Sequence, residues 1–256
     1  RKVYFFQHID VYGHQTEEAV HWNPADFLTE REPRVTIELE GKPVQLRAWE
    51  YRVRGADSYQ VPVLLLDTFV PENDQWQQSL TDFLYGGDSY YRLSQEAVLG
   101  IGGVRILRAL GYDRLERYHM NEGHAALLTL ELMRECAAKA GRSDVTTDDV
   151  ACVKEQCVFT THTPVDSGHD KFGMDWAPRL LGLTEGETAL GHLFVHDGLL
   201  NMTYLGLNLS RYVNGVALRH GEVSRKMFSG FRIDSITNGV HGGEWVAPAF
   251  AEAFDK

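Results

Sequence analysis

The spacing of hydrophobic residues changes along the chain, and its first third carries the period of two that is typical of β-strands. Hydrophobic and polar residues alternate from Val35 to Leu39 and from Val44 to Val53, on either side of the segment 40–43 (EGKP). The glycine of that segment can adopt the turn conformation of a hairpin, so the pattern predicts two antiparallel strands. The run from Val61 to Val70 is almost entirely apolar and predicts a buried strand.

Short apolar runs alternate with segments of helical spacing from residue 76 onward. Strands are predicted at 115–120, 157–161 and 232–237, and helices at 79–84, 90–110, 125–135, 147–156, 175–181, 187–199 and 207–228. Strands separated by helices favour a parallel sheet with right-handed crossovers. The predicted fold class is therefore α/β, with a β-rich N-terminal layer in residues 1–75 and a βαβ portion in residues 76–256.

Three glycines interrupt the predicted helix at 90–110. Gly100, Gly102 and Gly103 do not match the G-x-G-x-x-G spacing of a phosphate-binding loop, and they lie within a helical period. We therefore interpret them as sites of close helix packing.

All three predicted parallel strands end in polar loops that contain a histidine. These loops are Asn121-Glu122-Gly123-His124, Thr161-His162-Thr163 and the segment 238–241 (NGVH). The carboxyl ends of parallel strands share one edge of the sheet, where open α/β folds bind their ligands. The sequence thus predicts one crevice lined by His, Asn, Glu and Thr side chains, which suits a polyhydroxyl ligand. No nucleophile triad and no Walker loop identifies a reaction.

Glu122 and His162 are the candidate catalytic residues. Glu122 has the chemistry of a general acid, a general base or an acceptor for a sugar hydroxyl, although the helix macrodipole alone favours an acidic residue at this position. His162 lies at the end of a strand between Thr161 and Thr163, and this arrangement favours contacts with sugar hydroxyls.

Asn121, His124 and Asp88 each allow a binding role and a structural role. Asn121 caps the following helix or orients a neighbour, and His124 donates to a substrate or fixes its own loop. Asp88 follows two glycines and acts as a substrate gate or as the cap of the helix near Tyr90. Thr161 and Thr163 complete the predicted substrate-binding set.

The pair His192 and His196 has the spacing of metal ligands on one helix face. No third ligand lies nearby in the sequence, so a solvated helix face is the favoured interpretation and no metal site is predicted.

The composition excludes several classes of partner. The formal net charge is −11 and no run of Lys or Arg stands out, which argues against nucleic acid and anionic membranes as partners but not against a neutral sugar. No apolar run approaches the roughly 18 residues of a membrane span. The cysteines Cys136, Cys152 and Cys157 are too few and too poorly spaced for a disulfide framework, which favours a reducing, cytoplasmic location.

The chain resembles the α-glucan phosphorylases, which act on glycogen, starch or maltodextrin, and in particular their shorter bacterial and archaeal type. Five ordered stretches carry the resemblance, with a sixth at 4–18: residues 84–111 (LYGGDSYYRLSQEAVLGIGGVRILRALG), 119–135 (HMNEGHAALLTLELMRE), 159–172 (FTTHTPVDSGHDKF), 208–228 (NLSRYVNGVALRHGEVSRKMF) and 236–248 (ITNGVHGGEWVAP).

The resemblance implies two Rossmann-like domains facing each other across a cleft, the type B glycosyltransferase arrangement. This chain would be most of the N-terminal domain, and the C-terminal domain of the same parent chain would be its partner, within a possible homo-oligomer. The implied reaction is the reversible phosphorolysis of α-1,4-glucan by inorganic phosphate to glucose 1-phosphate, with retention. The implied cofactor is pyridoxal 5'-phosphate, which acts in this family through its phosphate group.

The resemblance also assigns roles to single residues. His162 matches the family histidine that contacts the glucosyl unit, and Asn121, Glu122 and His124 match an Asn-acid-x-His motif. That motif has Asp and a following Pro in the better-known animal and plant enzymes, where this chain has Glu122 and Ala125. Asp88 falls in the segment that matches a mobile loop gating the active site.

The cofactor lysine and the glycine-rich phosphate-contacting loop of the family are expected outside this chain, so the isolated chain is expected to be inactive. Two alternatives stay open: a glucan-binding relic without turnover, and a sugar-nucleotide glycosyltransferase of the same fold. A retaining glycosidase is disfavoured because it needs a second carboxylate about 5 Å from Glu122, and the sequence places none there.

Overall fold

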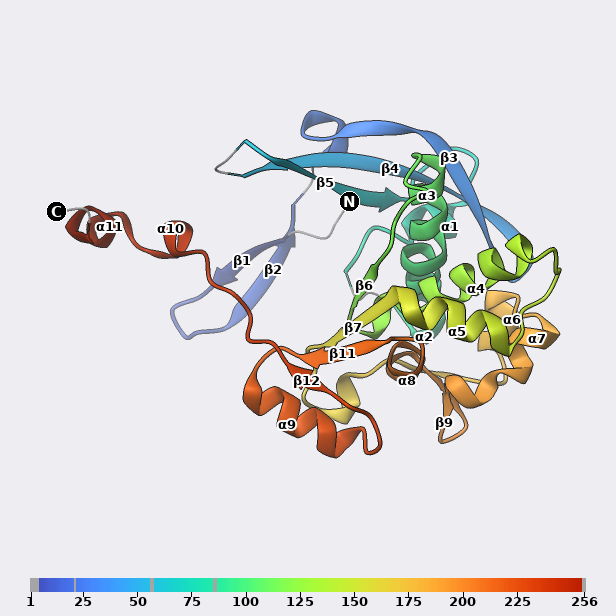
Figure 1. The fold of residues 1–256 in the computed structure, drawn as a ribbon. Coiled ribbons are helices and arrows are strands. Elements are labelled where there is room, and N and C mark those ends of the chain that lie inside the picture. The colour runs from blue at the N-terminus through green and yellow to red at the C-terminus, as the bar shows by residue number, and fades with distance from the viewer. Residues whose placement is uncertain (1–4, 21, 56–57, 85–86, 255–256) are drawn as a thin grey trace.

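The structure is a computed structural model that describes residues 5–20, 22–55, 58–84 and 87–254. Four sheets are present within these ranges, and the largest is a parallel sheet of four strands in the order β12-β11-β7-β6. The predicted α/β class is confirmed by this parallel sheet and its helices (Figure 1).

The N-terminal portion is antiparallel. Strands β3 (Thr29–Leu39), β4 (Lys42–Arg54) and β5 (Gln60–Asp67) form one sheet, and β1 (Phe5–Ile9) pairs with β2 (Gln15–Ala19) in a separate hairpin. Leu39 is opposite Lys42, so a two-residue turn joins β3 to β4. Both turn residues have positive φ, +51° at Glu40 and +71° at Gly41, as hairpin turns of this length require. The predicted hairpin is confirmed, and a strand follows it. The prediction that this strand is buried is wrong, because β5 is an edge strand whose apolar side chains are exposed or half-buried, with Val61 50% and Val63 40% exposed.

The parallel sheet contains the three predicted strands and one that the sequence did not predict. β6 (Tyr118–Asn121), β7 (Cys157–Thr161) and β12 (Asp234–Ser235) lie within or close to their predicted ranges. The predicted helix at 207–228 is wrong, because it is divided into α8 (Met202–Asn208), the strand β11 (Tyr212–Gly215) and α9 (Leu218–Met227). β11 pairs with both β7 and β12, and these two neighbours stabilise a four-residue strand whose apolar spacing also fits a helix.

A second predicted helix, at 187–199, is also wrong. The segment forms α7 (Glu185–Ala189), a 3-10 turn η5 (Gly191–Leu193), and the short strands β9 (Val195–His196) and β10 (Leu199–Asn201), which pair with β8 (Lys171–Gly173). A capping box between Thr184 and Glu187 starts α7 early and α7 ends at Ala189. The neighbouring helix predicted at 175–181 is confirmed as α6 (Ala177–Leu181).

Seven further α-helices are present among the described residues. They are α1 (Gln75–Ser79), α2 (Ser89–Ala97), α3 (Gly103–Ala109), α4 (Leu128–Lys139), α5 (Thr147–Gln156), α10 (Gly242–Trp245) and α11 (Pro248–Phe254), with 3-10 turns η1 (Pro24–Asp26), η3 (Gly123–Ala125) and η4 (Asp166–Gly168). The helix predicted at 79–84 is wrong. A capping box between Asp74 and Gln77 starts α1 at Gln75, α1 ends at Ser79, and no helix continues through residues 80–84. In Figure 1, α10 and α11 extend away from the rest of the chain.

The predicted helix at 90–110 consists of α2 and α3 joined by a π-helical segment η2 (Val98–Gly102). A Cβ atom added to Gly100 would lie 2.6 Å from the backbone nitrogen of Leu128 and 2.8 Å from the carbonyl carbon of Leu127. This contact confirms the close-packing interpretation for Gly100, and a Cβ at Gly102 would likewise lie 2.6 Å from Leu46 Cδ2. The interpretation is wrong for Gly103, where the nearest atom would be 3.9 Å away.

One hydrophobic core connects the antiparallel and parallel sheets. It includes Ile37 and Leu46 of the antiparallel sheet, Leu93 of α2, and Met120 and Phe159 of the parallel sheet, all of them almost completely buried. The helical layer α2–η2–α3 therefore packs against both sheets and fixes the loops at the carboxyl edge of the parallel sheet.

No helix among the described residues is long and apolar enough to cross a bilayer.

The cysteines differ from expectation. Cys136 of α4 and Cys152 of α5 form a disulfide, and Cys157 is free and buried. The two partners are 16 residues apart in sequence. This pairing was not apparent in the amino-acid sequence, because it depends on α5 folding back against α4.

Asp67, at the end of β5, gives a first testable prediction. Its buried carboxylate accepts hydrogen bonds from the Trp49 indole N–H, the Arg47 guanidinium and the backbone N–H of Phe69, each at 2.9 Å. Burial alone would raise the pKa of Asp67, but these donors hold it below the ordinary value of 3.8. Because the folded-state pKa is lowered, the stabilisation is present above about pH 4 and is lost as the pH falls through the folded-state value.

We expect Asp67→Asn to lower the free energy of unfolding at pH 7 by about 2 kcal/mol, since the amide cannot accept from all three donors. The difference from the native chain should shrink below about pH 4 in urea unfolding curves. Glu38→Gln, an exposed substitution on the same sheet, is the control. A difference that stays constant between pH 7 and pH 3 would contradict the assignment.

Candidate functional site

Of the three histidine-bearing loops predicted to converge, those that follow β6 and β7 meet at the carboxyl edge of the parallel sheet. The third, at 238–241, is exposed and follows β12, at the opposite edge of the sheet from β6. Asn121 pairs with Thr160 in the register of the two strands, and the backbone N–H of Glu122 donates to the Thr160 carbonyl at 2.9 Å. Asn121 is exposed and does not cap a helix, because the chain continues into η3 and α4 begins only at Leu128. The capping interpretation of Asn121 is therefore wrong.

Glu122 holds the loop that carries His162. Its Oε2 atom accepts hydrogen bonds from the backbone N–H groups of His162, at 2.7 Å, and of Thr163, at 2.9 Å. The carboxylate is buried, with 6% of the residue exposed, and it does not cap η3. Its backbone has φ +66° and ψ 174°, a region that is almost restricted to glycine. The side chain thus joins the two loops from a strained backbone position.

Buried polar atoms without a hydrogen-bond partner gather around this junction. They include Glu122 Oε1, the Thr161 hydroxyl and His169 Nε2. The other ring nitrogen of His169 lies 2.9 Å from the Thr203 hydroxyl, and burial lowers the pKa of His169, which favours the neutral ring. Buried polar atoms in folded proteins nearly always have partners, so these three atoms mark a place for water or for polar ligand groups.

Three of the predicted binding residues line one pocket of about 520 Å³. Asp88, His124 and Thr163 contribute to its wall, together with Arg92, Asp170 and Lys171, which sequence reasoning missed. The Asp88 side chain also accepts from the backbone N–H of Tyr91 at 2.9 Å and caps α2. Both interpretations of Asp88 are therefore compatible with the structure, since it caps a helix and also faces the pocket.

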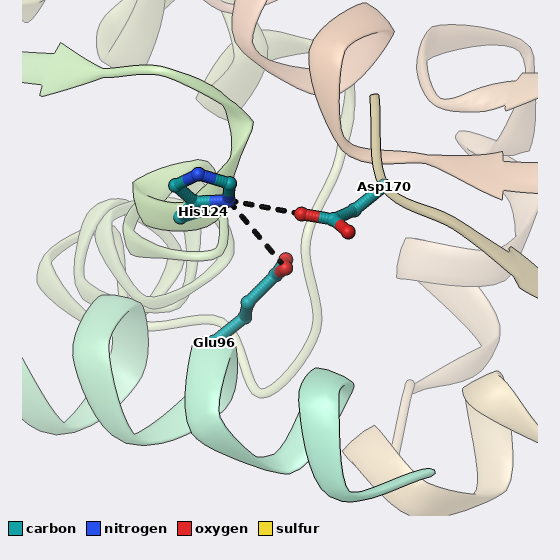
Figure 2. A group of neighbouring side chains, drawn as sticks. All are labelled: Glu96, His124 and Asp170. Atoms are coloured by element: carbon teal, nitrogen blue, oxygen red, sulfur yellow. Dashed lines mark hydrogen bonds and ion pairs between the residues drawn. The ribbon is translucent and has the colours of Figure 1, made fainter. Parts of the chain in front are cut away.

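His124 lies in a charged cluster at this wall (Figure 2). Its Nδ1 atom is 2.9 Å from Asp170 Oδ2 and 3.8 Å from Glu96 Oε1, and Arg92 Nη2 is 2.9 Å from both His124 Nδ1 and Asp170 Oδ2. Burial alone would lower the pKa of His124, but the hydrogen bond to Asp170 and the nearby Glu96 carboxylate raise it to about 9. Burial raises the pKa of Glu96 to about 7, whereas His124 and Arg92 outweigh burial at Asp170 and lower its pKa.

The other predicted residues lie close to this pocket or beneath it. His162 is half-buried at the strand end, and the Thr161 side chain is fully buried in the sheet edge. The Thr160 hydroxyl lies 2.6 Å from His119 Nε2 and donates to Oδ1 of the buried Asn214 amide at 2.9 Å. Asn214 was not expected in a strand, since residues 207–228 were predicted as one helix, and its place beside β7 depends on the parallel pairing of β11.

His192 and His196 do not share a helix face. His192 is exposed in η5, and His196 belongs to β9 and stacks on Tyr204 with ring centroids 4.1 Å apart. The predicted helix at this place is wrong, but the conclusion that the pair makes no obvious metal site agrees with this geometry.

Comparison with known proteins agrees with the motifs. Glycogen phosphorylase of Mycobacterium tuberculosis is 36% identical over an alignment that covers 98% of this chain and 32% of the relative. Maltodextrin phosphorylase of Thermococcus litoralis is 34% identical, with coverages of 99% and 32%, and glycogen phosphorylase of Aquifex aeolicus is 30% identical, with coverages of 86% and 33%. No protein-family model matches the chain. The chain spans about a third of the length of these relatives, and the resemblance of its motifs to glycogen and maltodextrin phosphorylases is confirmed along nearly its whole length.

Proposed function

We propose that this chain is part of an α-glucan phosphorylase and forms the glucan side of its active-site cleft, within one half of a type B glycosyltransferase fold. The observation that carries the proposal is the convergence of Asp88, His124 and Thr163 on one polar pocket, next to the His162 loop, in a chain similar to phosphorylases. Sugar-binding sites need several fixed donors and acceptors, and this pocket wall offers carboxylates, cations and hydroxyl groups.

In this proposal His162 contacts the glucosyl unit, and Glu122 acts on the substrate through the loop that it holds. The Glu122 oxygen that accepts the two backbone N–H groups is occupied, and its other oxygen is buried. Oε2 is therefore engaged in holding the loop, and Oε1 is the oxygen that remains for water or a polar ligand group. Through Oε2, Glu122 is a positioning residue, whereas sequence reasoning had proposed it as catalytic.

The described lysines do not fit the site of a pyridoxal phosphate cofactor. Lys42, Lys139, Lys154 and Lys226 are exposed, and Lys171 forms an ion pair with Asp166 at 2.8 Å. A lysine that forms a Schiff base needs an amine of lowered pKa, usually in a desolvated position. We therefore propose that the cofactor lysine and the phosphate-binding cations belong to another part of the whole protein.

The test uses the protein expressed from its whole reading frame. We expect a pyridoxyl adduct in the intact mass after borohydride reduction, and release of glucose 1-phosphate from maltodextrin only when phosphate is present. Maltodextrin binding without an adduct and without release would instead support a glucan-binding relic. Transfer from a nucleotide-activated glucose without an adduct would support a sugar-nucleotide glycosyltransferase.

The isolated chain gives a further prediction. We expect it to release no glucose 1-phosphate under conditions in which the whole protein is active, because the cofactor lysine and the phosphate-binding cations are proposed to belong to another part of the protein. A phosphate-dependent release above the blank in a coupled assay of the purified chain would contradict this.

A further inference from the structure

Glu96, His124 and Asp170 come from three separate elements and direct their side chains toward one another (Figure 2). Glu96 lies on α2, His124 on η3 and Asp170 just before β8. One ligand atom from each residue lies within 4.8 Å of the other two. Three ligands that each lie about 2.1 Å from one tetrahedral ion would be about 3.4 Å apart, so only small side-chain shifts separate the cluster from a coordination geometry.

The Glu96 carboxylate makes this cluster more than a network of charged residues. Only 2% of its side chain is exposed, and neither oxygen accepts a hydrogen bond. The nearest cation, the Nε atom of Arg92, is 3.3 Å from Oε1. A buried carboxylate normally has several donors or a metal ion, because a carboxylate without them loses its hydration free energy. On the side that faces His124 and Asp170, Glu96 accepts no hydrogen bond and has only a long ion pair of 3.8 Å with His124 Nδ1.

We propose that Glu96, His124 and Asp170 form a binding site for a divalent transition-metal ion of the zinc class. Two carboxylates and one imidazole suit such an ion, since Zn²⁺ accepts both oxygen and nitrogen ligands. Water or a ligand in the adjoining 520 Å³ pocket, which His124 and Asp170 line, completes the coordination. This inference is independent of the proposed phosphorylase activity.

Arg92 is the cation that the metal ion would replace. Its Nη2 atom lies 2.9 Å from both His124 Nδ1 and Asp170 Oδ2, which is close to the place of the ion. Arg92 also lines the 520 Å³ pocket and a second pocket of about 430 Å³, which Glu96 and His124 line too. Its side chain therefore has space to move away when the ion binds. Arg92 and the ion compete for the same carboxylates. Removing the charge of Arg92 should therefore tighten the binding of the ion.

The experiment is a calorimetric titration of the chain with Zn²⁺, using Mg²⁺ as the comparison ion. We expect one Zn²⁺ per chain, binding at least about tenfold tighter than Mg²⁺ because an imidazole is among the ligands. Glu96→Gln and Asp170→Asn should each weaken Zn²⁺ binding by about tenfold or more. His192→Ala, which removes an exposed histidine outside the cluster, is the matched control and should leave the affinity unchanged.

Arg92→Gln provides a second test, because a misfolded chain would lose Zn²⁺ binding and could not gain it. Because it removes the competing charge, it should tighten Zn²⁺ binding by about tenfold. An Arg92→Gln chain that binds Zn²⁺ no more tightly than the native chain would overturn the proposal. The proposal would also be overturned if His192→Ala weakened Zn²⁺ binding as much as Glu96→Gln does, or if the native chain bound no stoichiometric Zn²⁺.

Discussion

Replacing Glu122 by alanine should lower the free energy of unfolding by about 3 kcal/mol, because the backbone N–H groups of His162 and Thr163 lose their shared acceptor. Both groups donate to one buried carboxylate oxygen, and each unsatisfied buried donor costs about 1–3 kcal/mol. The measurement is urea unfolding of the chain at pH 7. In the whole protein we expect the same substitution to lower kcat more than it raises KM, since the His162 loop would lose its fixed orientation.

Glycine at the same position separates the carboxylate from the backbone. Glu122 has φ +66° and ψ 174°, which costs a residue with a Cβ atom about 1–3 kcal/mol but costs glycine little. Glu122→Gly should therefore be about 1 kcal/mol more stable than Glu122→Ala, although glycine is usually the more destabilising residue. If alanine is the more stable of the two, the backbone strain at this site is smaller than we infer. Glu122→Gln retains one acceptor oxygen and should lie between the native chain and Glu122→Ala.

Replacing Gly100 by alanine should destabilise the chain by about 3 kcal/mol or more. The added Cβ would meet backbone atoms of Leu127 and Leu128 at 2.6–2.8 Å, and backbone cannot move aside as a flexible side chain can. The helical layer and the start of α4 would have to separate, and the loop with Glu122 and His124 precedes α4 directly. Thermal unfolding followed by circular dichroism measures the effect.

Gly103 is the matched control for Gly100, because it lies in the same continuous helix. A Cβ at Gly103 finds its nearest neighbour, Leu66 Cδ1, at 3.9 Å, which is ordinary contact. Gly103→Ala should therefore be neutral or stabilising by up to about 1 kcal/mol through helix propensity. Equal losses from the two substitutions would mean that helix geometry, and not the contact with Leu127 and Leu128, explains the glycine at position 100.

The sequence predicted those parts of the fold that depend on local patterns. The hairpin at residues 35–53 and the strand β7 followed from spacing and turn residues, and the meeting of the Glu122 and His162 loops followed from parallel topology. The strand β11 was missed because the pattern of its four residues does not exclude a helix. Its strand conformation depends on pairing with β7 and β12, which are distant in the sequence.

The charged cluster was missed for a related reason. Arg92, Glu96, His124 and Asp170 span almost eighty positions, and each has an ordinary local explanation. Arg92 and Glu96 are spaced as an i,i+4 pair on a helix surface, where such pairs are common. Their burial against His124 and Asp170 depends on how α2 packs against the η3 turn. Hydrophobic periodicity indicates which face of a helix is buried, but it does not indicate which polar residues come together there.

The π-helical segment η2 has a consequence for length variation in this helix. A π segment contains one residue more than the corresponding α-helical turns, so it is equivalent to a single-residue insertion that the helix has absorbed without breaking. Deleting one residue between Val98 and Gly102 would let the helix continue with ordinary hydrogen bonds. Because the five residues of η2 turn the chain about as far as four α-helical residues would, α3 would keep its orientation relative to α2. Val104 and Ile106, which are buried, would still face the core. A deletion within η2 should therefore be tolerated better than a deletion within α2 or α3, which would rotate the following side chains by about 100°.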